Sequence, residues 1–227
     1  MKSLKNWFLV LSVLSCFGCS SPVHEDGRGC AFVSDSIQYR VEFMSAGCVR
    51  ILSFPEGDTL VTKRLVVDSE KPAFKDYKWE DTGQKLLFRT RELSVVFDKA
   101  DAAFIFQETS TGKLLLKEKG DRKARNFKRS VAGGEQCLEV TQRFVPTEDE
   151  AIYGLGQYQN GIMNYRGKSV LLLQANMDIV NPFLISTNGY GVLWDNYSST
   201  KFEDTKEGYS FTSEVGDASD YYFVYGK

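Results

Sequence analysis

Short runs in which apolar and polar residues alternate fill most of the chain after residue 30. In 37–43 every second residue is apolar, and 138–144 shows nearly the same spacing. A period of two is typical of a strand with one buried face. Other runs rich in β-branched and aromatic residues cover 48–54, 59–67, 85–90, 93–97, 102–108, 113–118, 169–174, 182–187, 190–194 and 220–226. No helical pattern of ordinary length is present, so the sequence predicts about a dozen strands.

Turn-forming residues separate these runs, as in "FPEGD", "DTGQ", "STGK", "AGGE" and "TNGYG". Between the apolar runs of "ISTNGYGVLW", the pair Asn188-Gly189 predicts a hairpin, because both residues tolerate positive φ. Strands at this spacing predict an all-β fold, a large antiparallel β-sandwich of two sheets.

One stretch departs from the strand pattern: "EAIYGLGQYQNGIMNYRG", residues 150–167. It lacks the Lys-Ser or Lys-Thr and the strand-to-helix context of a phosphate loop, and its many glycines are unfavourable in a strand. We therefore predict neither structure there. The glycines are expected to let the chain turn between sheets, with Arg166 held by carbonyls or by a carboxylate.

Composition and charge narrow the class of protein. The 227 residues are 42% hydrophobic and 13% aromatic, enough to bury a substantial core in a single all-β domain. A net charge of −2 gives no field that would attract nucleic acid or an anionic membrane. The basic segment 117–130 is interpreted as a solvated excursion between strands.

The N-terminus has the features of an export signal. Lys2 and Lys5 precede the apolar run Trp7–Phe17, which is too short to span a bilayer. Small residues followed by Cys resemble the lipoprotein signals of bacteria, and Cys16 is preferred over Cys19 as the lipidated residue. The alternative is an ordinary secretory signal with incidental cysteines.

These features divide the chain into a signal peptide at 1–15, a flexible tether at 16–30 and a β-sandwich domain at 31–227. The mature protein is expected to be exported, as a periplasmic or outer-membrane lipoprotein. Its contact with the membrane would be through the lipid anchor alone.

The predicted domain lacks the residues that several common catalytic mechanisms require. The single histidine, His24, lies in the expected tether, which leaves the domain without an imidazole for a Ser-His or Cys-His pair, a zinc ligand or a general acid. Cys30, Cys48 and Cys137 allow one disulfide in any of three pairings, or free thiols, and no CxxC spacing suggests a metal. No cofactor or metal is expected.

The acidic residues of the last third do not suggest catalysis either. The cluster 148–150 is expected to stay solvated and ionised. The remaining acids are expected to be turn residues and caps: Asp195, Glu203, Asp204, Asp217 and Asp220.

Four short elements occur in order within 148–203. They are "YGLGQ" at 153–157, "NYRG" at 164–167, "PFLIS" at 182–186 and "GYGVLWDN" at 189–196. Together they resemble the N-terminal β-sandwich domain of glycoside hydrolase family 31, the α-glucosidases and α-xylosidases. The earlier strands fit the first half of that domain without carrying a motif.

The resemblance implies a sandwich similar to galactose mutarotase that precedes a (β/α)8 barrel. In the family that barrel holds an aspartate nucleophile and an aspartate acid/base for retaining hydrolysis. The chain stops at "DYYFVYGK", where the family's chain passes on toward the barrel. We therefore expect no catalytic residue within these 227 residues and no hydrolysis by them alone. Mutarotase activity is not expected, because the enzymes of that fold that exchange anomers use a histidine acid.

The resemblance also implies that a loop of this domain reaches the sugar site. By its position before "PFLIS" the loop is "QANMDIVN", 174–181, and Gln174 and Asn176 are the candidate substrate-binding residues. Neutral amides both donate to and accept from sugar hydroxyls. The alternative is that both amides only cap the loop's own backbone. Aromatic side chains are expected to pack in the sandwich rather than stack on sugar: Tyr153, Tyr158, Tyr165 and Trp194.

Two functions follow from this reading. The first is the non-catalytic leading domain of an exported α-xylosidase or α-glucosidase, with α-linked oligosaccharide and a C-terminal barrel as partners. The second is a free-standing, lipid-anchored carbohydrate-binding or structural β-sandwich protein.

Overall fold

A computed structural model describes residues 22–58 and 73–226. Both lipidation candidates, Cys16 and Cys19, and the strand predicted at 59–67 lie outside these ranges. Every regular element of the described part is a strand, and every strand pairing is antiparallel. No helix there is long and apolar enough to cross a bilayer.

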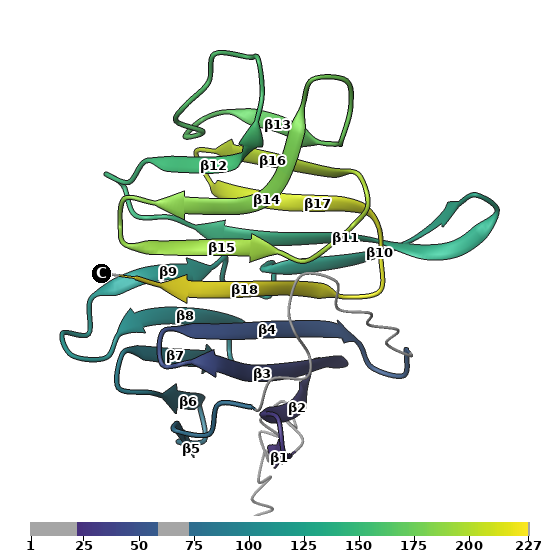
Figure 1. Cartoon of the computed structure of the whole chain (residues 1–227). Helices are drawn as coiled ribbons and strands as arrows, with labels where there is room; N and C mark the ends of the chain where they lie inside the picture. The colour runs from purple at the N-terminus through teal and green to yellow at the C-terminus, as the bar shows by residue number, and fades with distance from the viewer. Residues whose placement is uncertain (1–21, 59–72, 227) are drawn as a thin grey trace, which may run out of the picture.

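The strands form two large sheets, which confirms the predicted antiparallel β-sandwich (Figure 1). The 8-stranded sheet runs in the order β1 (His24–Glu25), β2 (Cys30–Ser34), β3 (Ile37–Ser45), β4 (Cys48–Pro55), β18 (Ser219–Tyr225), β15 (Tyr190–Trp194), β14 (Ile179–Ser186), β12 (Ile152–Gln157). The 10-stranded sheet runs in the order β13 (Ser169–Leu172), β16 (Thr200–Thr205), β17 (Gly208–Gly216), β11 (Glu135–Val145), β9 (Leu114–Glu118), β8 (Ala103–Glu108), β7 (Leu93–Asp98), β6 (Lys85–Arg89), β5 (Lys78–Asp81). The tenth strand, β10 (Arg125–Ala132), pairs with β11.

The core lies between the sheets and is rich in aromatic rings. Alternate residues of β3 (Tyr39, Val41 and Phe43) are buried in it, as the sequence period predicts. Trp194 of β15 stacks on Phe211 of β17 at 5.6 Å between ring centroids, which joins the two sheets. Such rings combine large buried apolar area with specific pairing geometry, so they fix how the sheets face each other.

The hairpin predicted at Asn188-Gly189 is confirmed, with Ser186 opposite Tyr190. Only Gly189 has positive φ, at +88°. Asn188 instead uses its side chain: Nδ2 donates to the carbonyl oxygen of Leu115 at 2.7 Å. The turn therefore also ties the hairpin to the other sheet, a contact that the local sequence does not show.

The prediction that 150–167 contains no strand is wrong, because Ile152–Gln157 is β12, paired with β14. The glycines that argued against a strand allow an irregular one. The register shifts between Gly154 and Gly156, and Leu155 between them has φ of +65° with a fully buried side chain. A Cβ on Gly156 would stand 2.0 Å from the carbonyl oxygen of Ile179. Glycine here permits a bulge and close approach of two backbones.

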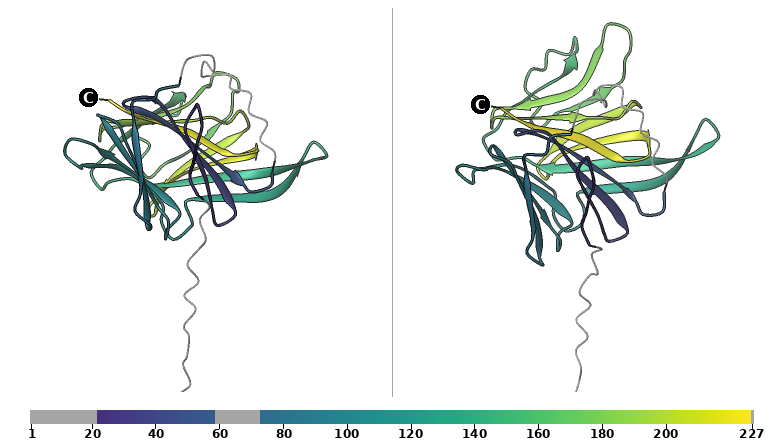
Figure 2. Two further views of the ribbon diagram at one scale, coloured as in Figure 1. Left: turned by 90° about the horizontal axis from the view of Figure 1, so that it is seen from below. Right: turned by 60° about the horizontal axis from the view of Figure 1, so that its bottom comes forward.

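The interpretation of 117–130 as a solvated excursion is wrong for its second half. Residues 125–132 are β10, in unbroken register with 135–142 of β11. The two-residue turn between them, Gly133 and Gly134, has φ of +59° and +86°, as a tight hairpin requires. Figure 2 shows the end of this hairpin reaching out beyond the sandwich.

Five further strands, β1, β2, β5, β16 and β17, stand where no strand is predicted. Among them, β1 lies within the range 16–30, which was expected to be a flexible tether. It pairs with the start of β2, and Glu25 accepts hydrogen bonds from Tyr77 and Trp79 at 3.0 and 3.1 Å. These partners come from a distant part of the sequence, so local composition gives no sign of them.

Candidate functional site

The loop between β13 and β14 carries both predicted substrate-binding residues and stands at the end of the molecule shown at the top of Figure 1. Gln174 Nε2 donates to the carbonyl oxygen of Asp178 at 2.8 Å, and its Oε1 accepts from the Val180 amide at 3.1 Å. Both ends of this amide therefore hold the loop in shape, as in the capping alternative. Asn176 is exposed, and its side chain has no hydrogen bond within the described residues.

A cleft of about 370 Å³ opens beside this loop. It is lined by residues 172–174 from β13 and the loop, 180–182 from β14, and 193–200 from the end of β15 to the start of β16. It therefore bridges the ends of both sheets. A volume of this size is within the range of small-molecule sites, about 300–1,000 Å³.

The floor of the cleft is fixed by buried hydrogen bonds. Trp194 Nε1 donates to Ser213 Oγ at 2.9 Å, and that hydroxyl lies 2.6 Å from Thr200 Oγ1. All three side chains are essentially buried. Because their polar atoms satisfy one another, the floor is rigid and offers a ligand only apolar contact.

The wall made by 195–199 is fixed in a similar way. Asn196 Oδ1 accepts from both the amide and the hydroxyl of Ser198 at 2.8 Å, and its Nδ2 donates to the carbonyl oxygen of Val215 at 3.0 Å. The Ser198 hydroxyl in turn accepts from the Val215 amide at 3.1 Å. The short polar side chains of this loop thus hold its backbone to β17.

Two polar side chains of the cleft stand outside these contacts. Asp195 continues the strand ladder through its amide, which donates to the Asp220 carbonyl at 2.9 Å. Its carboxylate oxygen Oδ1 is buried, yet it accepts no hydrogen bond from the described residues. Asn181 is exposed and likewise has no hydrogen bond through its side chain within the described part of the chain. Sequence reasoning missed both residues because their surroundings are set by contacts between distant strands.

A second hollow, of about 620 Å³, lies along β5 and β6. It is lined by 76–80, by Leu87 and 89–91, and by Thr109. Its exposed charges have both signs, since Asp76 and Glu80 are acidic and Lys78, Arg89 and Arg91 are basic. The hollow is larger but stands at the far edge of the 10-stranded sheet from β13 and the loop. The smaller cleft, which adjoins the loop with Gln174, is therefore the better candidate for the sugar site.

The "NYRG" element serves the scaffold. Arg166 Nε donates to Asp204 Oδ2 at 2.9 Å, and its NH1 donates to the carbonyls of Thr147 and Glu150 at 3.2 and 3.0 Å. This confirms the expected role of Arg166. Asp204 also accepts from the Gly167 amide at 2.6 Å, so it fastens the segment after β12 to β16.

The expectation that most acids of the last third are solvated or in turns is wrong in four cases. Glu150 is buried between the sheets and accepts from Tyr190 OH at 2.7 Å and Thr147 Oγ1 at 3.1 Å. Burial and the adjacent Glu150 hold the pKa of Tyr190 well above its ordinary value. The other three lie within strands: Glu203 and Asp204 in β16, and Asp220 in β18. Asp217 does lie in a turn, between β17 and β18.

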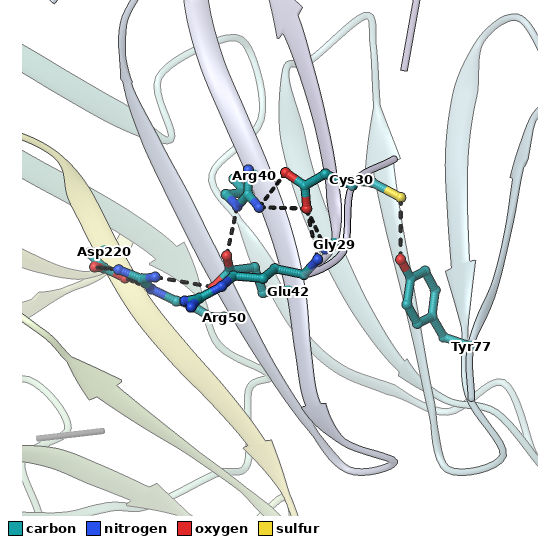
Figure 3. A network of polar contacts seen from close by, with 9 residues as sticks. Gly29, Cys30, Arg40, Glu42, Arg50, Tyr77 and Asp220 are labelled. Atoms are coloured by element: carbon teal, nitrogen blue, oxygen red, sulfur yellow. Dashed lines mark hydrogen bonds and ion pairs between the residues drawn. The ribbon is translucent and has the colours of Figure 1, made fainter. Parts of the chain in front are cut away.

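Asp220 belongs to a line of alternating charges on β18, β4 and β3 (Figure 3). Arg50 Nε donates to Asp220 Oδ1 at 2.7 Å, and Arg50 NH1 donates to Glu42 Oε2 at 3.1 Å. Arg40 then bridges Glu42 and Asp26, with both closest N to O distances at 2.6 Å. Burial opposes the charge on Arg50, but the bonds to Asp220 outweigh it and raise its pKa. Each carboxylate in this line contacts an arginine, which indicates a structural role.

A second charged cluster lies within the core around Glu118. Its carboxylate accepts from the Phe104 amide at 2.8 Å, Gln142 Nε2 at 2.8 Å and Tyr221 OH at 2.9 Å, and it forms an ion pair with Arg125. Its side chain has no exposed surface. A carboxylate that already accepts four donors has no capacity left for a substrate.

Three of the four aromatic side chains expected to pack in the sandwich do so, whereas Tyr153 is partly exposed and is not among the residues packed against the core. Tyr165 and Trp194 are buried, and Tyr158 packs against the core with its OH donating to the Leu155 carbonyl at 3.0 Å. The three described cysteines are free thiols: Cys30, Cys48 and Cys137. In the described ranges, no group of three or more His, Cys, Asp or Glu side chains is placed to hold a metal ion.

Comparison with known proteins gives a consistent result. Residues 38–203 match the family model described as the glycosyl hydrolase 31 N-terminal galactose mutarotase-like domain. The α-xylosidase of Saccharolobus solfataricus is 32% identical over an alignment 206 residues long, which covers 84% of this chain and 26% of that protein. The chain thus spans about a quarter of the length of this curated relative.

Solved structures agree with this match. The GH31 α-xylosidase of Xanthomonas citri superposes with a TM-score of 0.71 and 31% identity, over 81% of this chain and 20% of that one. A GH31 α-xylosidase from a soil metagenome, complexed with xylose, gives a TM-score of 0.77 at 23% identity, over 91% of this chain and 32% of that one. At that identity the second likeness shows a shared fold alone.

Proposed function

The chain belongs to glycoside hydrolase family 31, and on this premise we propose that it is the non-catalytic N-terminal domain of an α-glycosidase. Its residues 38–203 match the N-terminal galactose mutarotase-like domain of that family. The complete enzyme would hydrolyse α-xylosides or α-glucosides with retention, through two aspartates of a (β/α)8 barrel. One observation carries the proposal: similarity to an α-xylosidase over 84% of this chain occupies only 26% of that enzyme.

The distribution of exposed apolar side chains supports a partner domain. Of ten large apolar side chains exposed in the described part, seven lie in 163–197: Met163, Leu171, Leu173, Met177, Ile179, Ile185 and Tyr197. This range contains β13, β14 and β15, of which β13 is an edge strand of the 10-stranded sheet and β14 lies next to the edge strand of the 8-stranded sheet. Gathered exposed apolar groups mark interaction surfaces. We assign the part of this range outside the cleft, with Met163, Leu171, Met177, Ile179 and Ile185, to contact with the catalytic barrel.

The loop 174–181 would then stand close to the sugar site. Within it Asn176 has an uncommitted amide that can both donate to and accept from sugar hydroxyls. Gln174 would contribute by holding the loop in shape, since both ends of its amide already bond to the loop. In a barrel-bearing enzyme, Asn176→Ala should lower turnover of an oligosaccharide more than that of an aryl glycoside. Equal effects would speak against contact with the sugar beyond the scissile bond.

Export with a lipid anchor is a further part of the proposal, supported by Lys2, Lys5 and the apolar run 7–17. Labelling with radioactive palmitate in a bacterial host tests it. Cys16→Ser should abolish labelling while Cys19→Ser leaves it, and the opposite result would move the anchor to Cys19. If the wild type itself takes up no label, the lipid anchor is refuted.

The decisive experiment compares this chain alone with the same chain followed by a barrel. The chain alone should not hydrolyse nitrophenyl α-xyloside or α-glucoside, and measurable turnover would overturn its non-catalytic role. Reading the DNA downstream of the Lys227 codon complements the assay. An open frame that continues into a barrel supports the proposal, whereas a stop followed by an unrelated gene supports a free-standing carbohydrate-binding protein.

A further inference from the structure

The polar groups of the cleft beside the loop divide into two sets. Gln174, Asn196 and Ser198 use their side-chain donors and acceptors to hold the walls, and Thr200 bonds to Ser213 in the floor. These side chains already use at least one donor or acceptor to hold the cleft in shape. Asp195, Asn181 and Ser199 also line the cleft and make no side-chain hydrogen bond within the described residues, and of these three Asp195 and Asn181 carry the carboxylate and the amide.

Asp195 is the unusual member of this pair. A buried carboxylate oxygen without a donor is unfavourable, because the group has lost hydration and gained nothing in return. Most buried polar atoms in proteins find a partner. Asp195 Oδ1 is one of seven buried side-chain atoms of the described residues that lack one, and the only one of the seven on a residue that lines this cleft. One explanation for that position is binding, in which a donor from a ligand completes the site at the expense of stability without it.

The lining of the cleft narrows the chemistry of that donor. Residues 172–174, 180–182 and 193–200 include no Lys, Arg or His, and Asp195 is their only acidic residue. One carboxylate without other anionic ligands is a poor site for a divalent cation, which prefers six or more oxygen ligands. Hydroxyl donors suit it well, because hydrogen bonds from hydroxyls to carboxylates are short and strong.

The remaining surface suits a ring that has both apolar and polar sides. Leu173 and Pro182 present apolar surface, and the Asn181 amide can donate to one hydroxyl and accept from another. A pyranose carries hydroxyls around its rim and C–H groups on its faces. Its size is compatible with a cleft of about 370 Å³.

We propose that this cleft is a saccharide-binding subsite in which the Asp195 carboxylate accepts hydrogen bonds from adjacent hydroxyls of a neutral pyranose and the Asn181 amide contacts a third. The proposal deepens the proposed function, on which the choice of an α-xyloside as probe rests. It assigns sugar recognition to residues outside the loop tip at Asn176. The walls of the cleft are formed before the ligand arrives, whereas the Asp195 side chain has to turn for its buried Oδ1 to meet a hydroxyl.

Binding of methyl α-xyloside to this chain alone tests the proposal. Saturation-transfer NMR detects contact, and a titration followed by two-dimensional amide spectra gives the Kd. The wild type should bind with a millimolar Kd, with shifts at the amides of 193–200. Asp195→Asn keeps the shape but removes the charged acceptor, so it should weaken binding about tenfold or more. Asp217→Asn, at an exposed turn outside the cleft, is the matched control and should bind as the wild type does.

Thermal unfolding separates recognition from a structural role. If Asp195 is uncompensated in the free protein, Asp195→Asn should leave Tm unchanged or raise it, whereas a structural carboxylate would give a lower Tm. A lower Tm together with unchanged binding would overturn the proposal. No binding by the wild type at roughly 100 mM sugar would do the same, since a recognition site should be substantially occupied there.

Methylammonium chloride serves as a competing probe. Shifts at 193–200 with methylammonium and none with the sugar would assign Asp195 to a cation and overturn the proposal. Because binding is measured on this chain and hydrolysis depends on a catalytic barrel, the subsite and the proposed function can fail independently.

Discussion

Glu118 in the core and Asp195 in the cleft are both carboxylates with buried oxygens, and their surroundings differ sharply. Glu118 accepts from three neutral donors and pairs with Arg125, whose guanidinium carbon also lies 4.9 Å from the centre of the Tyr39 ring. Asp195 has an oxygen that accepts nothing within the described residues. The Glu118 carboxylate is fully hydrogen-bonded, although Nε of the neighbouring Arg125 has no acceptor within the described residues, whereas the Asp195 carboxylate keeps an oxygen without a donor.

The difference shows how to sort polar groups in a fold that carries many of them. A saturated cluster inside a low-dielectric core strengthens itself and is strongly coupled to folding. An unsaturated group at the rim of a cleft contributes little to folding and retains capacity for a ligand. Burial of a charged residue is therefore a weak guide to function, and its count of satisfied hydrogen bonds is a better one.

The same carboxylate-to-amide change at both sites tests the comparison most directly. Glu118→Gln leaves the Arg125 charge in the core without its counter-ion, and breaking a buried pair in this way costs about 3–5 kcal/mol. We expect Tm to fall by roughly 10 °C or more. Asp195→Asn should leave Tm unchanged or higher. Calorimetry of the three proteins measures both effects, and similar losses at the two sites would remove the distinction.

The bulge of β12 offers the next largest effect, because it fixes the edge strand from which the cleft end is built. Gly156→Ala places a Cβ 2.0 Å from the Ile179 carbonyl oxygen at a residue with φ of +117°. The backbone must move, at a cost of about 2–3 kcal/mol. Gly161→Ala is the control: its φ is +69° and a Cβ there meets nothing within 4 Å. It should lose only about 1 kcal/mol, as denaturant unfolding will show.

A smaller effect is expected at the loop. There Gln174 is hydrogen-bonded, as Glu118 is, and Asn176 is not within the described residues, as is the case for Asp195 Oδ1. Gln174→Ala removes two hydrogen bonds at an exposed site and should reduce stability by about 1 kcal/mol. The Val180 amide donates a hydrogen bond to Gln174 Oε1, so its hydrogen exchange should accelerate in this variant. Asn176→Ala should change neither quantity. Faster exchange in both variants would mean that Asn176 also supports the loop.

Cys30 provides a group between these extremes, since its buried thiol has one weak partner, Tyr77 OH at 3.7 Å. Burial raises the pKa of Cys30 from 9.0 to about 11, although the Tyr77 contact opposes the rise. Because the folded pKa is the higher one, this stabilising contribution is complete below pH 9 and is lost as pH rises through about 11. The loss should not exceed about 1 kcal/mol near pH 9.5. Cys30→Ser should show a flatter stability profile over this range, and identical profiles would contradict the assignment.

The sequence predicted most strands because their period of two is a local property, as in β3 and β11. The prediction was wrong at β12, where the glycines suggested a loop but in fact allow a bulge in a strand paired with β14. It also failed at β10, whose exposed and basic composition resembles a solvated loop although its pairing with β11 is regular. In both cases a distant or opposing strand supplies the hydrogen bonds that local propensity could not foresee.

The sequence predicted where the candidate site lies, but not which of its side chains are free to bind a ligand. The position of "QANMDIVN" before "PFLIS" located the loop that borders the cleft. The sequence could not show that Gln174 bonds to its own loop, nor that Asp195 would be left without a donor. Those outcomes depend on which side chains of 172–200 meet when both sheet ends come together.

The sequence by itself determined the all-β class, the two-sheet architecture, the family signature and the absence of histidine from the residues after the expected tether. Periodicity, turn residues and motif order are written locally, so they can be read along the chain. Only the tertiary structure decided which carboxylates are fully hydrogen-bonded, as Glu118 is, and which keep an oxygen without a donor in the described ranges, as Asp195 and Asp204 do. Hydrogen-bond satisfaction is a property of groups that are distant in sequence, and it exists only after the sheets have packed.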